Sequence, residues 1–594
     1  MLKVLEKYRP ILEVASLLGR RSQIKLALLT IAQMFISILD LLGVILIGLL
    51  VSLVTLTVTN VEAGGATATL TKILQLETAN ESSRFAVLGI IAAAFFVSKS
   101  LMSLYLQRLT IFFVADKSSL LADNMVRKLL NLPLNHFRKY SGSELNYIFS
   151  TGIQKIMQGL ISRPIFALSD VFLVLALSMG IFLADPLLAF SVLVYFGLLA
   201  GALYKFQHNH MRNLGLAMRD LHIENLAQIQ EIVKSFKVVS ISGLQDRYAK
   251  KIKENRISLT RASAIANLSS SIGKYVIEVA SVIGVVGVAI GLFATRAPST
   301  AAALVALFVS ASFRIGPAAL RLQSFFVTME VDLESARPAL EMIRDLKRKK
   351  AIQKKPNNIV RNYKLDDWTI CFDKVNFGYD NTSEILEDFN LTIKMGEHVA
   401  IVGPSGSGKT TLLDLLLGLI KPSNGLISIG SLNPTEFISE FPGAIAYVSQ
   451  DHTLSAGTLR SCILGPYTPE EVTDSEIVET LKKVSMHSLV RDLKDGLDHK
   501  IKDDGNNLSG GQIQRISIAR ALITKPKILV LDEATSNLDQ GTQREIVEEL
   551  SNLKGTCTVI VVAHRLEVLE HMDRILVLGS QEPPNAIKRK SQSV

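Results

Sequence analysis

A glycine-rich loop in the second half of the chain has the residues and spacing of a phosphate-binding site. The segment "EHVAIVGPSGSGKTTLLDLLLGLI" is an apolar strand, a loop and an apolar helix, in that order. Glycines let consecutive backbone N–H groups close around phosphate oxygens at a helix N-terminus, while Lys409 neutralises phosphate charge and Thr410 ligates Mg²⁺. The loop therefore predicts a site for ATP and Mg²⁺, and its candidate contacts are Gly403, Ser405, Gly406, Gly408, Lys409, Thr410 and Thr411.

A second apolar strand ends in two adjacent carboxylates. In "PKILVLDEATSNLD" the strand runs into Asp532, which is suited to hold Mg²⁺, and Glu533, which is suited to polarise an attacking water. Together with the glycine-rich loop, this pair predicts hydrolysis of the bound nucleotide.

A turn of small residues opens a helix shortly before these carboxylates. In "NLSGGQIQRISIARAL", Ser509, Gly510 and Gly511 form a second helix end suited to anions. With Tyr379 in "FGYD", Gln450 in "YVSQD" and His564 in "VVAHR", the stretch from about 370 to 575 closely resembles the nucleotide-binding domain of ATP-binding cassette (ABC) proteins.

The resemblance assigns further roles. It implies that Tyr379 stacks on adenine, that Gln450 ligates Mg²⁺ and links the γ-phosphate region to a membrane domain, and that His564 contacts the γ-phosphate. It also implies that Ser509, Gly510, Gly511 and Gln512 close the site of a second copy, so that ATP is clamped between two domains. One chain carries one set of these motifs, so we expect a dimer with a second half-transporter, a homodimer in the simplest case.

The first part of the chain is apolar enough to lie in a membrane. Hydrophobic residues make up 48% of the sequence and the mean hydropathy is +0.32. Each of six apolar runs is long enough to cross about 30 Å of hydrocarbon as a helix; the runs are 25–57, 85–113, 161–183, 186–204, 271–293 and 301–326. Lys and Arg concentrate in the loops on one side of these spans. Because loops rich in Lys and Arg lie in the cytoplasm, this distribution predicts that both termini are cytoplasmic.

These runs and motifs predict a two-domain chain. The expected fold is an α-helical polytopic membrane domain of six transmembrane helices, followed by an α/β P-loop NTPase domain. We expect the membrane domain at 1–335, a charged linker at 336–366, the nucleotide-binding domain at 367–580 and a basic disordered tail at 581–594. Six spans ahead of one cassette resemble the half-size ABC exporters, which implies a multi-pass protein, here of the bacterial inner membrane. The long helical arms at 114–160 and 205–270 are expected to transmit cassette closure.

Charged residues interrupt the predicted spans, and the candidates for a role in substrate binding are Asp40, Lys99, Arg314 and Arg321. A charge inside a span costs about 2.5–3.5 kcal/mol or more, so it faces a wet cavity, pairs, or reaches the interface. One reading is structural, with Asp40 paired to a cation. The other is functional, with Arg314 and Arg321 binding an anionic substrate such as a pyrophosphate.

The cargo is open at this stage. The first and last spans resemble, more loosely than the cassette does, bacterial lipid-linked oligosaccharide flippases, and export of other lipids, peptides or drugs is the alternative. A net charge of +10 raises the question of a cassette ATPase that acts on DNA or ribosomes, but the six spans argue against a nucleic-acid partner. A regulator that binds ATP without turnover would lack Glu533 or His564, and both are present.

Overall fold

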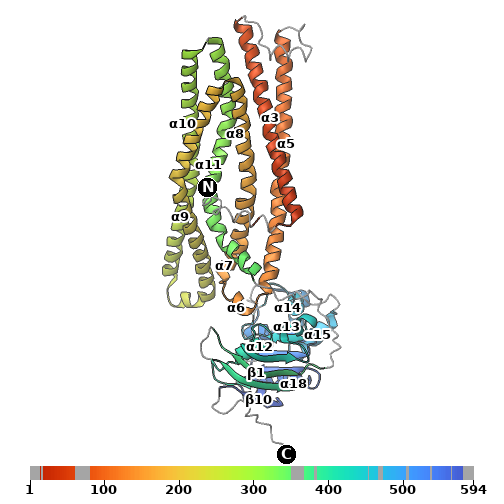
Figure 1. Cartoon of the computed structure of the whole chain (residues 1–594). Coiled ribbons are helices and arrows are strands. Elements are labelled where there is room, and N and C mark those ends of the chain that lie inside the picture. The colour runs from red at the N-terminus through yellow and green to blue at the C-terminus, as the bar shows by residue number, and fades with distance from the viewer. Residues whose placement is uncertain are drawn as a thin grey trace, which may run out of the picture. The chain divides into compact units, whose positions relative to one another are not determined.

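The computed structural model describes residues 14, 18–59, 81–296, 298–348, 367–379, 384–452, 454–465, 472–502, 507–534, 538–563 and 565–579. The chain forms two compact units (Figure 1). The first unit contains residues 1–130 and 138–350, and the second contains residues 131–137 and 351–594.

The first unit consists of long helices. They are α3 (Arg20–Thr59), α5 (Glu81–Leu130), α7 (Gly142–Tyr147), the π-helical turns η1 (Ile148–Gly152) and η2 (Lys155–Ser162), α8 (Arg163–Ala184), α9 (Pro186–Ile241), α10 (Gln245–Thr295) and α11 (Pro298–Arg348). Figure 1 shows α9, α10 and α11 running side by side. At 1.5 Å per residue, the 56 residues of α9 extend about 84 Å, which is longer than a bilayer is thick.

Five helical stretches among the described residues are long and apolar enough to cross a membrane. They are Arg20–Asp40, Gly89–Leu130, Gly142–Leu183, Ala189–Ile241 and Gln245–Thr295. The sixth predicted run, 301–326, lies within α11, which is a continuous helix through Pro317 and Pro338. The structure therefore supports a multi-pass membrane unit, and the sixth span stays a prediction.

Helix α11 is longer than the sequence suggested. The predicted membrane domain ended at 335, but α11 continues to Arg348, so residues 336–348 of the predicted linker are helical. Leu340, Ile343 and Leu346 are buried along this extension, and their burial favours a helix over a solvated linker. The rest of the predicted linker, 349–366, and the predicted tail, 581–594, lie outside the described residues.

The second unit is built on a parallel sheet. Its five strands are β3 (His398–Val402), β5 (Ile445–Val448), β8 (Ile528–Asp532), β9 (Thr558–Val562) and β10 (Arg574–Val577), in the order β10-β3-β9-β8-β5. All residues of β8 and β9 are buried, as expected for a sheet covered on both faces. An antiparallel sheet, β2-β1-β4, accompanies it; its strands are β1 (Ile370–Phe377), β2 (Leu386–Ile393) and β4 (Asn424–Ile429).

Short helices alternate with these strands along the chain. They are α12 (Lys409–Leu416), α13 (Pro434–Glu440), α14 (Leu459–Leu464), α15 (Asp474–Lys483), α16 (His487–Asp492), η3 (Gly496–Asp498), α17 (Gly510–Leu522), α18 (Gln540–Ser551) and α19 (Leu566–Leu569). A two-stranded ribbon pairs β6 (Gly457–Thr458) with β7 (Lys500–Ile501).

One short helix of this unit comes from far upstream in the sequence. Helix α6 (Leu134–Phe137) belongs to the second unit, where Leu134 packs against the core of the β1-containing sheet. The N–H of Leu134 donates to the Leu419 carbonyl over 3.0 Å. This turn lies within the predicted arm at 114–160, and its contacts place it in the second unit.

Candidate functional site

Parallel strand order brings the predicted nucleotide-binding segments to one edge of the sheet. Strands β3, β5, β8 and β9 are mutually parallel neighbours, so their carboxyl ends lie together. The glycine-rich loop follows β3, Gln450 follows β5, and β8 ends in Asp532. His564 follows β9 in sequence but lies outside the described residues, so its predicted contact with the γ-phosphate stays a prediction.

The loop after β3 has the backbone that its glycines allow. Gly406 and Gly408 have positive φ angles of 81° and 90°, and a Cβ at Gly408 would lie 2.8 Å from Ile385 Cγ2. Lys409 is buried, and its Nζ donates to the carbonyls of Gly403 and Pro404 over 2.7 and 2.9 Å. These bonds hold the ammonium group at the loop, where it can also donate to a phosphate oxygen.

The remaining predicted nucleotide contacts differ in how exposed their side chains are. Ser405, Gly406 and Thr410 are exposed along the loop and at the start of α12, whereas Thr411 is buried. Tyr379 is half-buried, and its ring packs edge to face on Phe377 at 5.0 Å between centroids. Thr410 and Tyr379 are therefore accessible to a nucleotide, while Thr411 supports the helix from inside.

Two predicted catalytic side chains contact each other. The Nε2 of Gln450 donates to Glu533 Oε2 over 2.8 Å. Glu533 has a φ of 51°, a left-handed conformation that costs a glutamate on the order of 1 kcal/mol or more, and its N–H donates to the Val562 carbonyl over 3.2 Å. The strained turn aims the Glu533 carboxylate toward Gln450 at the carboxyl edge of the sheet.

Asp532 is a buried carboxylate with a hydroxyl partner. Tyr447 donates its O–H to Asp532 Oδ2 over 3.2 Å. Burial raises the pKa of Asp532, and the charge of Glu533 raises it further, whereas the Tyr447 bond and Lys409 lower it. A bound cation would favour the ionised carboxylate. The oxygens of Thr410, Gln450 and Asp532, together with those of the phosphates, are the donors that Mg²⁺ prefers, so these residues fit the predicted ion.

The predicted second anion-binding end is the N-terminus of α17. Ser509 Oγ accepts from the N–H of Gln512 over 3.2 Å, and Gln512 Oε1 accepts from the N–H of Ser509 over 2.8 Å. This capping box holds the first turn, with Gly510 exposed beside it. Gln512 thus positions Ser509, a role that its prediction as a nucleotide contact did not include.

Three of the four charged substrate candidates, Asp40, Lys99 and Arg321, have protein partners. Lys99 Nζ lies 2.5 Å from Asp40 Oδ1. Arg321 donates from Nε and Nη2 to the carboxylate of Asp170, over 2.5 to 3.0 Å. The side chain of Arg314 lies outside the described residues. Sequence analysis missed Asp170, although a lone carboxylate in the apolar run 161–183 was the signal.

Sequence analysis also missed a row of buried carboxylates on α11. Glu330 lies 3.2 Å from His208 Nδ1, Asp332 pairs with Lys155 and Arg163, and Glu334 pairs with Arg212 and Arg337. Three acidic residues at alternate positions after an apolar run were the available signal. These pairs tie α11 to α9, η2 and α8.

Two family models match the chain. The model of the ABC transporter transmembrane region matches residues 26–314, and the ABC transporter model matches residues 386–536. The structure also resembles a solved bacterial Atm1-family ABC exporter with ATP bound, with a TM-score of 0.74 and 21% identity over 94% of this chain and 93% of the other. At this identity the likeness shows the fold alone.

Curated relatives match in two ways. An uncharacterized ABC transporter ATP-binding protein of Bacillus subtilis is 42% identical over 210 residues, 35% of this chain and 36% of the relative. A putative multidrug export ATP-binding/permease protein of Staphylococcus aureus is 41% identical over 212 residues, with the same coverage. The match thus spans about a third of these two relatives. An ATP-dependent lipid A-core flippase of Francisella tularensis is 27% identical over 77% of this chain and 74% of the relative.

Proposed function

This chain belongs to the ABC transporters, and we propose that it is an ATP-driven exporter or flippase. The observation that carries the proposal is the Gln450–Glu533 hydrogen bond beside the Lys409 loop and Asp532, on a chain whose other unit is a bundle of membrane-length helices. ATP hydrolysis in the second unit drives the helical unit between conformations that open to opposite sides of the membrane.

The chemistry follows from the charges at the sheet edge. Lys409 and the loop N–H groups hold the phosphates, and Glu533 orients and polarises the water that attacks the γ-phosphate. Gln450 donates to Glu533 and so fixes the direction of its carboxylate. Thr410, Asp532 and Gln450 would hold Mg²⁺, which would neutralise charge on the phosphates when bound.

The complete site needs a second chain. The N-terminus of α17, with Ser509, Gly510 and Gly511, closes the nucleotide site of the partner, and two identical chains supply two equivalent sites. Both termini and both cassettes lie in the cytoplasm of a bacterial cell, with the helical unit in the inner membrane.

The cargo is an amphiphile, a lipid-linked oligosaccharide or another anionic lipid. The relative that matches along most of both chains is named a lipid A-core flippase, which favours a lipid over the drug or peptide alternatives. Asp40, Lys99 and Arg321 have protein partners, so they support the helix bundle rather than bind this cargo. Arg314 stays a candidate cargo contact.

A mixed dimer tests the shared site. Chains with Lys409→Ala and chains with Gly510→Asp carry different affinity tags and are purified as mixed dimers in lipid nanodiscs. A Cβ at Gly510 meets no heavy atom within 4 Å, so the substitution should not disturb packing within the chain, and the aspartate charge should repel phosphate. Head-to-tail sites predict that both parent homodimers are inactive, whereas the mixed dimer keeps one intact site and hydrolyses ATP.

Phosphate release is the measurement, and a mixed dimer of two Lys409→Ala chains is the control. A mixed dimer as inactive as its parents would contradict a site built from two chains. An inactive wild type would contradict the proposed ATPase altogether.

A further inference from the structure

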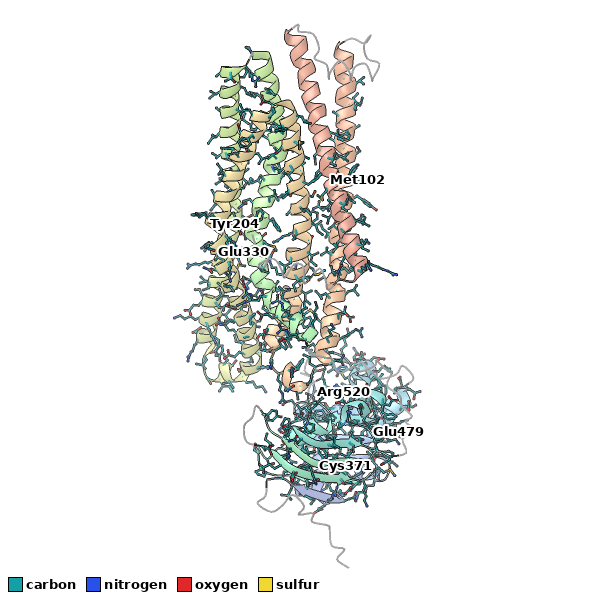
Figure 2. The ribbon with its side chains drawn as sticks, in the orientation of Figure 1. Met102, Tyr204, Glu330, Cys371, Glu479 and Arg520 are labelled. Carbon is teal, nitrogen blue, oxygen red and sulfur yellow. The ribbon has the colours of Figure 1, made fainter. Side chains whose placement is uncertain are left out.

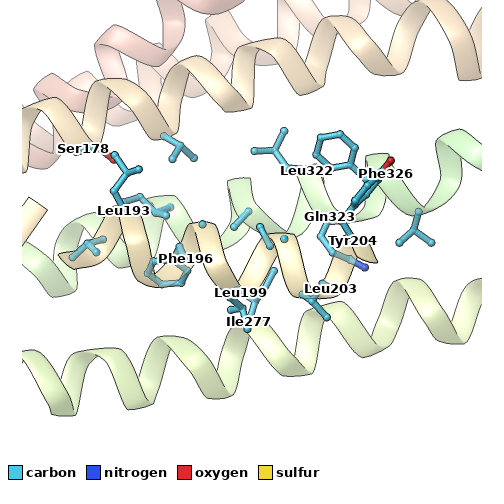
Figure 3. Close-up of a pocket in the computed structure, with 18 of the residues that line it drawn as sticks. Ser178, Leu193, Phe196, Leu199, Leu203, Tyr204, Ile277, Leu322, Gln323 and Phe326 are labelled. Atoms are coloured by element: carbon cyan, nitrogen blue, oxygen red, sulfur yellow. The ribbon is translucent and has the colours of Figure 1, made fainter. Parts of the chain in front are cut away.

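The described tyrosines use their side chains in different ways. Figure 2 labels Tyr204 on α9 of the first unit, and Figure 3 shows its ring beside Phe326 at one end of an apolar cavity of about 560 Å³. The Tyr204 ring also stacks on His208, with 5.0 Å between the ring centroids. Tyr147 and Tyr195 donate from their hydroxyls to backbone carbonyls of neighbouring helices. All of these contacts serve to pack helices together.

Three other tyrosines donate to carboxylates, and one of the three carboxylates is buried. Tyr140 and Tyr248 donate to exposed carboxylates, over 3.4 and 3.0 Å. Tyr447 of β5 donates to Asp532 Oδ2 over 3.2 Å, and Asp532 is 7% exposed. A hydrogen bond to a buried charge is stronger than one that competes with water. The Tyr447 bond is therefore the one of the three that we expect to hold its carboxylate in place.

The strand register places Tyr447 beside the end of β8. The Cα of Tyr447 lies opposite that of Val530, and Asp532 follows two residues later on the same face of the sheet. Ala446 and Val448, the two neighbours of Tyr447 in β5, belong to a buried core, whereas Tyr447 is 42% exposed and lies outside that core. The Tyr447 ring therefore adds little to the core, which favours a role for its hydroxyl.

The hydrogen bond restricts a carboxylate that has few other restraints. Within the described part of the chain, Tyr447 is the hydrogen-bond donor to the Asp532 carboxylate. The ammonium group of Lys409 donates instead to the carbonyls of Gly403 and Pro404. The χ2 torsion of an aspartate has broad wells, so a carboxylate without a partner rotates easily. A phenol is protonated at neutral pH, so it remains a donor that holds Oδ2 and leaves Oδ1 for an ion.

We propose that Tyr447 is a positioning residue for ATP hydrolysis. Its hydroxyl fixes the Asp532 carboxylate in the orientation that suits Mg²⁺, and it thereby sets the affinity of the site for Mg²⁺ and its preference for Mg²⁺ over Ca²⁺. The preference follows because Mg²⁺ requires near-ideal octahedral geometry, whereas Ca²⁺ tolerates irregular arrangements of oxygen ligands. The inference deepens the proposed function, on which it depends for the ion at Asp532.

The test compares two tyrosines that each lose one hydroxyl. Tyr447→Phe removes the donor to Asp532 and keeps the ring. Its matched control is Tyr248→Phe on α10, which removes a phenol–carboxylate hydrogen bond from the surface of the first unit. Full-length protein in nanodiscs is loaded with a non-hydrolysable ATP analogue, and bound Mn²⁺ is measured by electron paramagnetic resonance. Displacement of Mn²⁺ by Mg²⁺ or by Ca²⁺ gives the affinity for each of these ions.

We expect Tyr447→Phe to bind the analogue in EDTA as tightly as the wild type does, which also shows that the cassette is folded. Its affinity for Mg²⁺ should fall about tenfold, the usual effect of losing a group that orients a metal ligand, and its affinity for Ca²⁺ should fall by a smaller factor. Tyr248→Phe should match the wild type in every measurement. Unchanged affinity for Mg²⁺ in Tyr447→Phe would overturn the proposal, and equal losses for Mg²⁺ and Ca²⁺ would overturn the proposed ion preference.

A double variant tests whether Tyr447 acts through Asp532. In an Asp532→Asn background the aspartate carboxylate is already lost, so adding Tyr447→Phe should cause no further loss of affinity for Mg²⁺. A further loss of similar size in that background would overturn the positioning of Asp532 by Tyr447. Failure of the proposed function gives a different result. A loaded wild type that holds Mn²⁺ no more tightly than the free analogue does would contradict the ion site itself, and the inference with it.

Discussion

Buried charged side chains have different kinds of partners in the two units. In the described part of the first unit, each of the six buried carboxylates lies against a basic side chain; they are Asp40, Asp170, Asp185, Glu330, Asp332 and Glu334. In the second unit, Lys409 donates to two carbonyls and Asp532 accepts from a tyrosine. The helical unit neutralises its own charges, which stabilises its packing, whereas the cassette holds charges ready for an ionic ligand.

This difference predicts that Glu533→Gln has the largest effect on function. The amide cannot polarise the attacking water, so ATP turnover should fall about 100-fold or more, while ATP binding persists. Phosphate release and retention of labelled ATP measure the two quantities. Glu548→Gln, an exposed change on α18, should keep wild-type turnover; sustained hydrolysis by Glu533→Gln would remove the role we give this residue.

In the helical unit, removal of a buried carboxylate should reduce stability instead. Asp332→Ala leaves Lys155 and Arg163 without the carboxylate they share, at an expected cost of about 3 kcal/mol in the free energy of unfolding. The melting temperature in detergent measures the loss. Asp220→Ala, which breaks a pair with an exposed carboxylate, should cost less than about 1 kcal/mol. Equal losses would mean that burial of Asp332 is not what matters.

The Asp40–Lys99 pair permits a charge swap. Asp40→Asn leaves Lys99 without its carboxylate between α3 and α5, at an expected cost of about 2 kcal/mol. The double variant Asp40→Lys with Lys99→Asp restores opposite charges and should recover most of the melting temperature. A double variant no more stable than the single one would argue that the pair does more than neutralise charge.

Substitution of Asp532 should change the melting temperature in the opposite direction from substitution in these ion pairs. Because its pKa is raised by burial, the ionised carboxylate destabilises the empty fold above that pKa, and the penalty disappears as the pH falls below the ordinary carboxylate value. Asp532→Asn should therefore raise the melting temperature slightly at pH 7, with less gain near pH 4, and should abolish stabilisation by ATP and Mg²⁺. Thermal unfolding at the two pH values, with and without Mg-ATP, measures this; a lower melting temperature at pH 7 would contradict it.

The two units also differ in how much of their structure could be predicted from the sequence. The loop of Gly403 to Lys409, Gln450 and Glu533 was predictable because parallel strands place short motifs at one edge, wherever the rest of the chain goes. The partner of Arg321 was not, because Asp170 is 151 residues away and helix packing alone decides which spans meet. The membrane domain was predicted to end at 335, before the end of α11, because the charged residues after 335 resemble a linker although Leu340 and Ile343 among them are buried.

The capping role of Gln512 and the Tyr447–Asp532 bond were missed for a related reason. The motifs that contain Gln512 and Asp532 predict contacts with the nucleotide and its metal ion, and they do not indicate a cap for Ser509 or a hydrogen bond between strands β5 and β8. Sequence left a structural and a cargo reading open for the charges in the predicted spans, and the structure shows protein partners for Asp40, Lys99 and Arg321.

The most direct test of the account measures lipid movement itself. The protein is reconstituted in liposomes with a fluorescent phosphatidylglycerol, and dithionite reports the fraction of label in the outer leaflet. We predict that ATP changes this fraction in wild-type vesicles and not in Glu533→Gln vesicles. A change of equal size in both, or hydrolysis of ATP by the wild type without any change in this fraction, would contradict ATP-driven movement of a phosphate-bearing lipid.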